Sequence, residues 1–175
     1  MPKISISQTS AFKLCEDGTC DDPKAGSGHE TLECKKGDKC KGGGCYCQLF
    51  HREKNVKADD PWDVTPLDGT NEGKKKDGFD YKCICVKPIL DGYTICDNPL
   101  CHLSEVGDLG TGDATVECTG ECKDDGCTCN LFRLHTKPKD PEKKAKAKWE
   151  FLDGPKKKRD REKGYYYRCF CSKKA

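Results

Sequence analysis

The chain has 175 residues, of which 35% are charged and 16 are cysteine, and its formal net charge at pH 7 is +2. Leu, Ile, Val and Phe number only 27, a share at which a highly charged chain is expected to stay unfolded without further stabilisation. The near-neutral charge excludes polyanion binding by bulk charge, and no apolar run is long enough for a membrane span. The cysteine content predicts a fold held by disulfides or by metal–thiolate sites.

Residues 1–10 form an N-terminal arm that precedes the first cysteine. Ile4 and Ile6 alternate with serines, and this alternation predicts a short strand. We expect the arm to pair with its own chain or with the sheet edge of a neighbouring molecule, unless it is a frayed terminus. The arm has no recognisable counterpart later in the chain. It also lacks the apolar region of a signal peptide, which counts against secretion.

The rest of the chain divides into two similar units, residues 11–88 and 92–175, each with eight cysteines in the same order. The phrase Gly-Cys-x-Cys-x-Leu-Phe occurs in both, at residues 44–50 and 126–132. A repeat of this length predicts a tandem duplication of one small structural unit. Because every cysteine has a counterpart, no single thiol stands out as a nucleophile.

Short alternating runs bounded by turn residues predict a small antiparallel sheet in each unit. One run is ambiguous, because Asp140 and Pro141 are typical of a helix start, whereas Pro61 and Pro66 in the matching stretch favour a strand. The predicted fold class is all-β, small and cysteine-rich, with two tandem homologous antiparallel units. The predicted strands are 31–35, 44–53, 61–65 and 78–87 in the first unit, and 115–119, 126–135, 145–152 and 164–172 in the second.

The strand period places the cysteines of each C-x-C pair on one face of the sheet. Alternate residues of a strand face the same side, so Cys45, Cys47 and Leu49 would share one face, and Tyr46 and Phe50 the other. We expect the sulfurs to form the core of each unit. The aromatic face would pack the two units together or bind a partner, and packing within the molecule is the simpler interpretation.

All sixteen cysteines are predicted to form disulfides, four in each unit, or to bind metal if they are reduced. The two members of a C-x-C lie too far apart along a strand to bond each other, so we expect them to pair with the four earlier cysteines of their unit. The residues are Cys15, Cys20, Cys34, Cys40, Cys45, Cys47, Cys83 and Cys85, and then Cys96, Cys101, Cys118, Cys122, Cys127, Cys129, Cys169 and Cys171.

Zinc is the alternative to disulfides, because thiolates build tetrahedral zinc sites. The common zinc spacing C-x2-C does not occur among these cysteines, which favours disulfides and an oxidising compartment. We therefore expect no cofactor and a location outside the cell or on its surface. With zinc bound, the protein would instead be cytoplasmic.

A basic run in the second unit is a candidate polyanion-binding site. The interval 130–168 is rich in Lys and Arg, whereas the corresponding interval 48–82 is not. The run is typical of a nuclear-localisation or polyanion patch, with a sulfated glycan or nucleic acid as ligand. The simpler interpretation is a solvated, mobile loop tip. The candidate residues are Lys156, Lys157, Lys158, Arg159 and Arg161.

The sequence shows no phosphate loop, no base–nucleophile pairing and no duplicated acidic pair, so we expect a protein that is not an enzyme. The favoured function is an extracellular or surface binding or assembly module, which self-associates, binds a protein partner or acts as a double-headed inhibitor. The intervals 48–82 and 130–168 would supply the contacts. The alternative is an intracellular zinc-binding tandem module whose basic second unit contacts nucleic acid.

Overall fold

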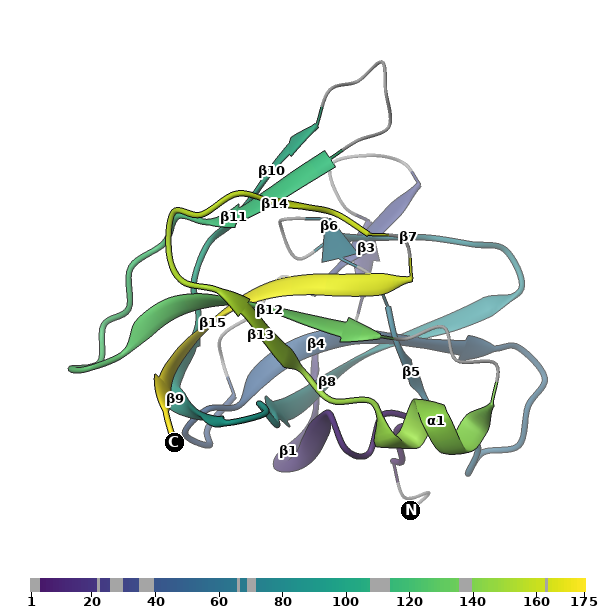
Figure 1. Cartoon of the computed structure of the whole chain (residues 1–175). Helices are drawn as coiled ribbons and strands as arrows, with labels where there is room; N and C mark the ends of the chain where they lie inside the picture. Colours follow the sequence, from purple (N-terminus) through teal and green to yellow (C-terminus); the bar gives the residue numbers. More distant parts are fainter. Residues whose placement is uncertain are drawn as a thin grey trace.

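Antiparallel strands make up most of the structure, a computed structural model, and the described part has one short helix, α1 (Figure 1). The structure describes residues 4–21, 23–25, 30–34, 40–65, 67–68, 72–107, 114–135, 140–162 and 164–175. Residues 1–3 of the arm lie outside these ranges. The elements are β1 (Phe12–Asp21), β2 (Lys24–Ala25), β3 (Thr31–Glu33), β4 (Tyr46–Glu53), β5 (Asp63–Val64), β6 (Leu67–Asp68), β7 (Glu72–Lys74), β8 (Phe79–Pro88), β9 (Tyr93–Leu100), β10 (Leu103–Gly107), β11 (Ala114–Cys118), β12 (Thr128–His135), α1 (Pro141–Lys146), β13 (Glu150–Asp153), β14 (Arg159–Asp160) and β15 (Tyr165–Lys174).

Each unit contributes one four-stranded main sheet, and the two main sheets correspond strand by strand. The first has the order β1-β8-β4-β5 and the second the order β9-β15-β12-β13. In both, the strand with the C-x-C phrase pairs along its length with the last strand of the unit. The all-β, antiparallel fold class predicted from the sequence is confirmed.

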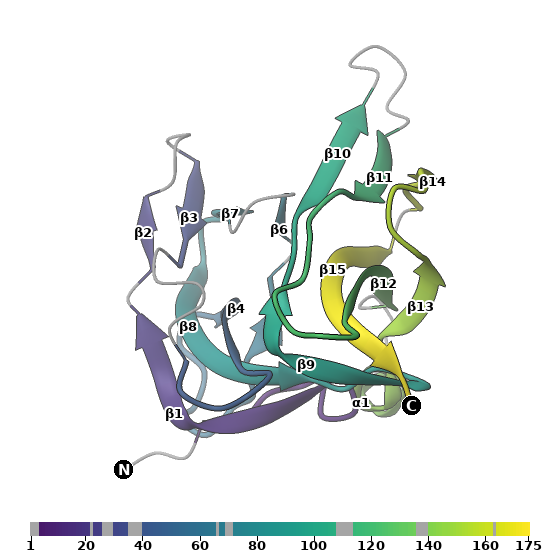
Figure 2. The ribbon, with the colours of Figure 1, turned by 90° about the vertical axis from the view of Figure 1, so that its left-hand side faces the viewer.

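Two smaller sheets accompany the main sheets. The order is β2-β3-β7-β6 in the first unit and β10-β11-β14 in the second. Figures 1 and 2 show both small sheets at the same end of the molecule, with α1 and the C-terminus at the opposite end. The described surface at the first end is therefore built by both units.

An aromatic core lies between the two main sheets. Tyr46 and Phe50 of the first unit and Phe132 and Phe170 of the second are fully buried in one cluster. The Tyr46 and Phe170 rings meet across the units, with centroids 5.8 Å apart. The aromatic face therefore packs within the molecule, as the simpler interpretation of the sequence expected. The sulfur face of each unit forms a smaller buried cluster of cysteine and aliphatic or aromatic side chains, and the larger shared core is built from aromatic and aliphatic side chains.

The described part of the arm pairs with its own chain, and the joint before the second unit pairs in the same way. Ile6 forms a parallel bridge with Trp62, and Leu90 forms the same bridge with Trp149. The Ser7 N–H donates to the Trp62 carbonyl at 2.9 Å, and the Asp91 N–H donates to the Trp149 carbonyl at 3.0 Å. The described part of the arm is thus the structural equivalent of the joint between the units, which corrects the expectation that it has none.

The stretch after Asp140 is a helix and not a strand. Asp140 Oδ1 accepts a hydrogen bond from the Glu142 N–H at 3.0 Å, which caps α1, and Pro141 occupies the first turn. The predicted strand 145–152 is therefore wrong at its start, and β13 begins only at Glu150. The prolines of the first unit misled the prediction because the two units differ in this connection. Lys144 of α1 also forms an ion pair with Asp63 of the first unit, at 3.0 Å.

Candidate functional site

All sixteen cysteines lie in the described ranges, and each is in a disulfide. The C-x-C cysteines bond the four earlier cysteines of their unit, as the strand geometry suggests, and the second unit has the same pattern as the first. The bonds are Cys15–Cys45, Cys20–Cys47, Cys34–Cys83 and Cys40–Cys85, followed by Cys96–Cys127, Cys101–Cys129, Cys118–Cys169 and Cys122–Cys171.

The repeated Gly-Cys-x-Cys phrase begins a strand of each main sheet and aims its sulfurs at the face away from the aromatic core. Gly44 and Gly126 both have left-handed backbone angles, with φ of 80° and 77°, which glycine adopts most readily. A side chain on Gly44 would also meet Ile95, since a Cβ there would lie 2.9 Å from Ile95 Cγ2. Gly44 therefore lies just before β4, at a point where the units approach closely.

Strand pairing brings further sulfurs to the same face. Cys47 lies opposite Cys85 across the β4–β8 ladder, and Cys129 lies opposite Cys171 across the β12–β15 ladder. A disulfide attaches each small sheet to the main sheet of its unit. Cys83 of β8 bonds Cys34, which directly follows β3, and Cys169 of β15 bonds Cys118, which ends β11.

The sulfurs gather into triads in which the three Sγ atoms lie within 4.8 Å of one another. Each unit has an inner triad, whose three cysteines are all buried, and an outer triad, of which two are only partly buried. One disulfide joins the two triads of a unit, so six sulfurs form a continuous cluster. The inner triads are Cys34, Cys47 and Cys83, and Cys118, Cys129 and Cys169; the outer triads are Cys20, Cys40 and Cys85, and Cys101, Cys122 and Cys171.

The basic run of the second unit lies on a turn and a short edge strand. Lys156 adopts a left-handed conformation, with φ of 63°, and its N–H donates to the Cys118 carbonyl at 2.8 Å. Arg159 then pairs with Val116, and β14 becomes an edge strand of the second small sheet. The candidate residues therefore lie on a defined strand and the turn before it.

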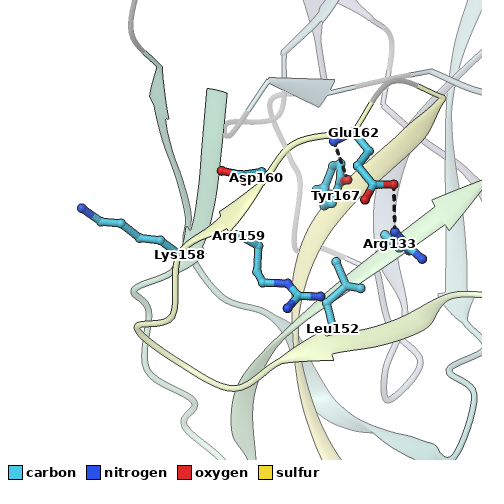
Figure 3. A pocket seen from close by; sticks show the side chains of 7 residues that line it. All are labelled: Arg133, Leu152, Lys158, Arg159, Asp160, Glu162 and Tyr167. Atoms are coloured by element: carbon cyan, nitrogen blue, oxygen red, sulfur yellow. Dashed lines mark hydrogen bonds and ion pairs between the residues drawn. The ribbon is translucent and has the colours of Figure 1, made fainter. Parts of the chain in front are cut away.

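The cations of the basic run do not all converge on one point. Lys157 Nζ and Arg159 Nη1 both lie 3.9 Å from the carboxylate of Asp153, and the Arg161 guanidinium lies 5.9 Å from the centroid of the Tyr167 ring. Lys158 points away from the Arg159 side chain in Figure 3. The run is exposed and basic, but its geometry suits diffuse attraction to a polyanion better than enclosure of one anionic group.

A hollow of about 340 Å³ beside this run is lined by charges of both signs. Its wall includes Arg133, whose Nη1 donates to Glu162 at 3.3 Å (Figure 3). The Arg133 Nε also lies 3.4 Å from Glu150. Burial lowers the pKa of Arg133, but the neighbouring Glu150, Tyr165 and Glu162 outweigh it and raise the pKa overall. Because Arg133 is paired with Glu150 and Glu162, and the second arginine of the wall, Arg159, lies 3.9 Å from Asp153, the hollow is not a ready anion site.

Comparison of the chain with protein-family models, with curated proteins and with solved structures finds no match. Function must therefore be argued from the residues and their geometry. In the ranges that the structure describes, no helix combines the length and apolar character needed to cross a bilayer.

One base–hydroxyl contact was not foreseen from the sequence. His51 Nδ1 lies 2.9 Å from Thr65 Oγ1, which is the reach of a general base to a nucleophile. Thr65 is only 4% exposed, and the Phe79 ring lies edge-on to His51 at 5.5 Å. A hydroxyl enclosed in this way is not open to a substrate, so we interpret the pair as structural. No local pattern could have indicated this contact, because His51 lies in β4 and Thr65 directly follows β5.

Proposed function

We propose that the chain is a non-enzymatic binding or assembly module that works outside the cell or on its surface. The observation that carries the proposal is the complete pairing of its cysteines into eight disulfides, with no free thiol among them. Disulfides persist in oxidising compartments and are rare in the cytosol. They also hold binding surfaces in place before a partner arrives, which lowers the entropy lost on association.

The two units support bivalent binding because their insertions differ while their main sheets correspond. Between the two central strands, the first unit adds β6 and β7 to the equivalent edge strand β5, whereas the second adds α1 and β14 to its edge strand β13. The shared aromatic core fixes the two sets of insertions relative to each other. Two different contact surfaces at a fixed separation suit a double-headed inhibitor, a linker of two protein partners or a self-assembling subunit.

The basic run is proposed as a secondary contact for a sulfated glycan or nucleic acid. Lys156, Lys157, Lys158 and Arg159 are exposed, and the turn and strand hold them on one edge of a small sheet. Their divergent side chains lead us to expect weak, salt-sensitive binding that depends on charge and not on a shaped pocket.

Intact mass before and after reduction tests the main proposal on the purified chain. Reduction of eight disulfides adds about 16 mass units, and alkylation before reduction should modify no cysteine. Light scattering over a range of concentrations then tests self-association. Free thiols in the isolated protein, or metal in place of the disulfides, would overturn the proposal.

The secondary contact is tested by the salt concentration that elutes the chain from immobilised heparin and from DNA. Replacing Lys156, Lys157, Lys158 and Arg159 by Gln should lower that concentration clearly. The matched control replaces four exposed lysines of the first unit, Lys54, Lys74, Lys75 and Lys76, which changes the net charge by the same amount. Equal effects of the two variants would show that net charge alone is responsible and would exclude a site.

A second candidate function is an intracellular zinc-binding tandem module whose basic second unit contacts nucleic acid. The specific observation in its favour is the close approach of three sulfurs in every triad. Metal analysis of the chain purified without oxidation distinguishes the two functions, since zinc would be removed by a chelator with loss of structure.

A further inference from the structure

We propose that the two triads of each unit, once reduced, together form a two-metal thiolate cluster with zinc-like divalent cations. The proposal goes beyond the binding module described above, because it concerns the reduced chain. In the first unit the ligands would be Cys20, Cys34, Cys40, Cys47, Cys83 and Cys85, and in the second Cys101, Cys118, Cys122, Cys129, Cys169 and Cys171.

Two of the three sulfurs in each triad are disulfide-bonded to each other in the oxidised chain, and the third lies within 4.8 Å of both. In a tetrahedral zinc site the Zn–S distance of about 2.3 Å places the sulfurs about 3.8 Å apart. Reduction would release the bonded pair, and side-chain rotations with small shifts of the strands would then bring the three thiolates to this spacing. The inner triad is buried beneath a small sheet, which shields its ligands from water.

The bond between the triads indicates which sulfurs would bridge the two metals. Two tetrahedra that share an edge need six thiolates, of which two are common to both metals. Cys20 belongs to the outer triad and Cys47 to the inner triad, and they are bonded to each other. These two sulfurs therefore lie near the remaining members of both triads, and Cys101 and Cys129 have the same place in the second unit.

Conversion of the disulfides into metal-binding thiolates requires a reductant. A dithiol supplies two electrons and two protons to each disulfide, yields two thiols and is itself oxidised to a disulfide. Three disulfides per unit give six thiols, and binding of two divalent cations to the six thiolates releases six protons. The cluster then carries a formal charge of about −2 in each unit, from two dications and six thiolates.

The fourth disulfide of each unit provides an internal control. Cys15 and Cys45 belong to neither triad, and the same holds for Cys96 and Cys127. Their sulfurs should stay outside the cluster, which makes this proposal narrower than metal binding by all eight cysteines of a unit.

The test uses the full oxidised chain, reduced without oxygen by a phosphine in the presence of Zn²⁺ or Co²⁺ and then freed of excess metal. A phosphine takes up the oxygen of water as it reduces each disulfide, and it competes for metal less than a dithiol does. We expect about four metal ions per chain, two in each unit. With Co²⁺ we also expect thiolate-to-metal charge-transfer bands and the visible bands of tetrahedral cobalt.

Two paired variants distinguish the bridging cysteines from the control pair. Cys15→Ser with Cys45→Ser should keep about four metal ions per chain, whereas Cys20→Ser with Cys47→Ser should bind about three or fewer, because the first unit loses its bridges. Near-ultraviolet circular dichroism before reduction verifies the fold of each variant. If the second variant does not fold, the first variant decides together with the unaltered chain, because loss of metal from the Cys15 and Cys45 variant would show that all eight cysteines of the unit take part.

The proposal is overturned if the reduced chain takes up no metal, if it binds about one ion per unit, or if the two variants lose metal equally. These outcomes are separate from a failure of the binding-module proposal, which is measured on the chain before reduction by its mass and its free thiols.

Discussion

Tyr46 of the first unit and Phe170 of the second meet at the centre of the molecule, with their ring centroids 5.8 Å apart and both side chains fully buried. The Arg168 guanidinium lies over the Tyr46 ring, 4.9 Å from its centroid, and the Tyr46 hydroxyl donates to Gln48 Oε1 at 3.0 Å. Burial raises the pKa of Tyr46 above its ordinary value, although Arg168 opposes this rise. The two units therefore share one core and should unfold together.

Replacing Phe170 by Ala tests this shared core. Phe170 contacts Tyr46, Phe132 and Trp149, so its truncation should lower the free energy of unfolding by about 3–5 kcal/mol. Both units should be affected, although the residue belongs to the second. Denaturant unfolding with intact disulfides measures the loss.

The fluorescence of Trp62 and Trp149, observed separately in variants that keep one tryptophan, reports on each unit during this unfolding. We expect coincident transitions that shift together in the Phe170 variant. Phe151→Ala is the control, because Phe151 is 38% exposed and should cause a smaller loss. A Trp62 transition that Phe170→Ala leaves unchanged would show that the units are independent.

The Cys118–Cys169 disulfide should attach the second small sheet to its main sheet. Replacing both cysteines by Ala opens a loop with a sequence separation of 51 residues and should lower stability by about 2–4 kcal/mol. Hydrogen exchange should show lost protection in β11, with protection kept in β12. In the control, replacement of Cys96 and Cys127 should leave β11 protected, because that bond ties β9 to the start of the C-x-C strand. Uniform loss of protection in both variants would contradict this assignment.

The described part of the arm should stabilise the molecule as a core segment. Ile6 is 5% exposed and lies in the shared core, so Ile6→Ala should lower the free energy of unfolding by about 2–5 kcal/mol. Ile89→Ala is the matched control, since Ile89 is 40% exposed. Chemical denaturation measures the free energy of unfolding of the two variants. An arm that served only to join a neighbouring molecule would instead change the association state and leave the monomer's stability intact.

The features that the sequence predicts best are those with a strict local period. The alternation of Cys47 and Leu49 with Phe50 was enough to place sulfur and aromatic side chains on opposite faces, because strand geometry leaves no other arrangement. β1 was not predicted, since four of the ten residues in Phe12–Asp21 are charged and its pairing with β8 has register shifts. The equivalence of Ile6 and Leu90 was also missed, because the distance to the next cysteine differs between the units.

Other features depend on contacts between distant parts of the chain, which no local pattern records. The basic run gave no sign that Arg159 would pair with Val116, because a two-residue edge strand has no detectable period. The triads likewise arise only when two ladders and a small sheet come together. The sequence supplied the cysteines and their faces, and the fold supplied their proximity.

His51 should make the stability of the protein depend on pH. Burial lowers the pKa of His51 below its ordinary value of 6.5, partly opposed by Asp63 and reinforced by Lys144 and Lys76. In the window between the lowered pKa and about 6.5, the unfolded chain binds a proton that the folded chain does not. The contribution of His51 is therefore complete above about pH 6.5 and is lost as the pH falls through this window.

Urea unfolding at a series of pH values between about 5 and 7.5 measures this effect. His51→Gln, which keeps a polar group near Thr65, should lose less stability on acidification than the unaltered chain does. The exposed His102 provides the control, and His102→Gln should keep the full pH dependence. The difference in pH dependence between the His51 variant and the other two proteins reports the contribution of the His51 side chain. If the free energy of unfolding changed equally with pH in all three proteins, burial of His51 would not disfavour its charged form.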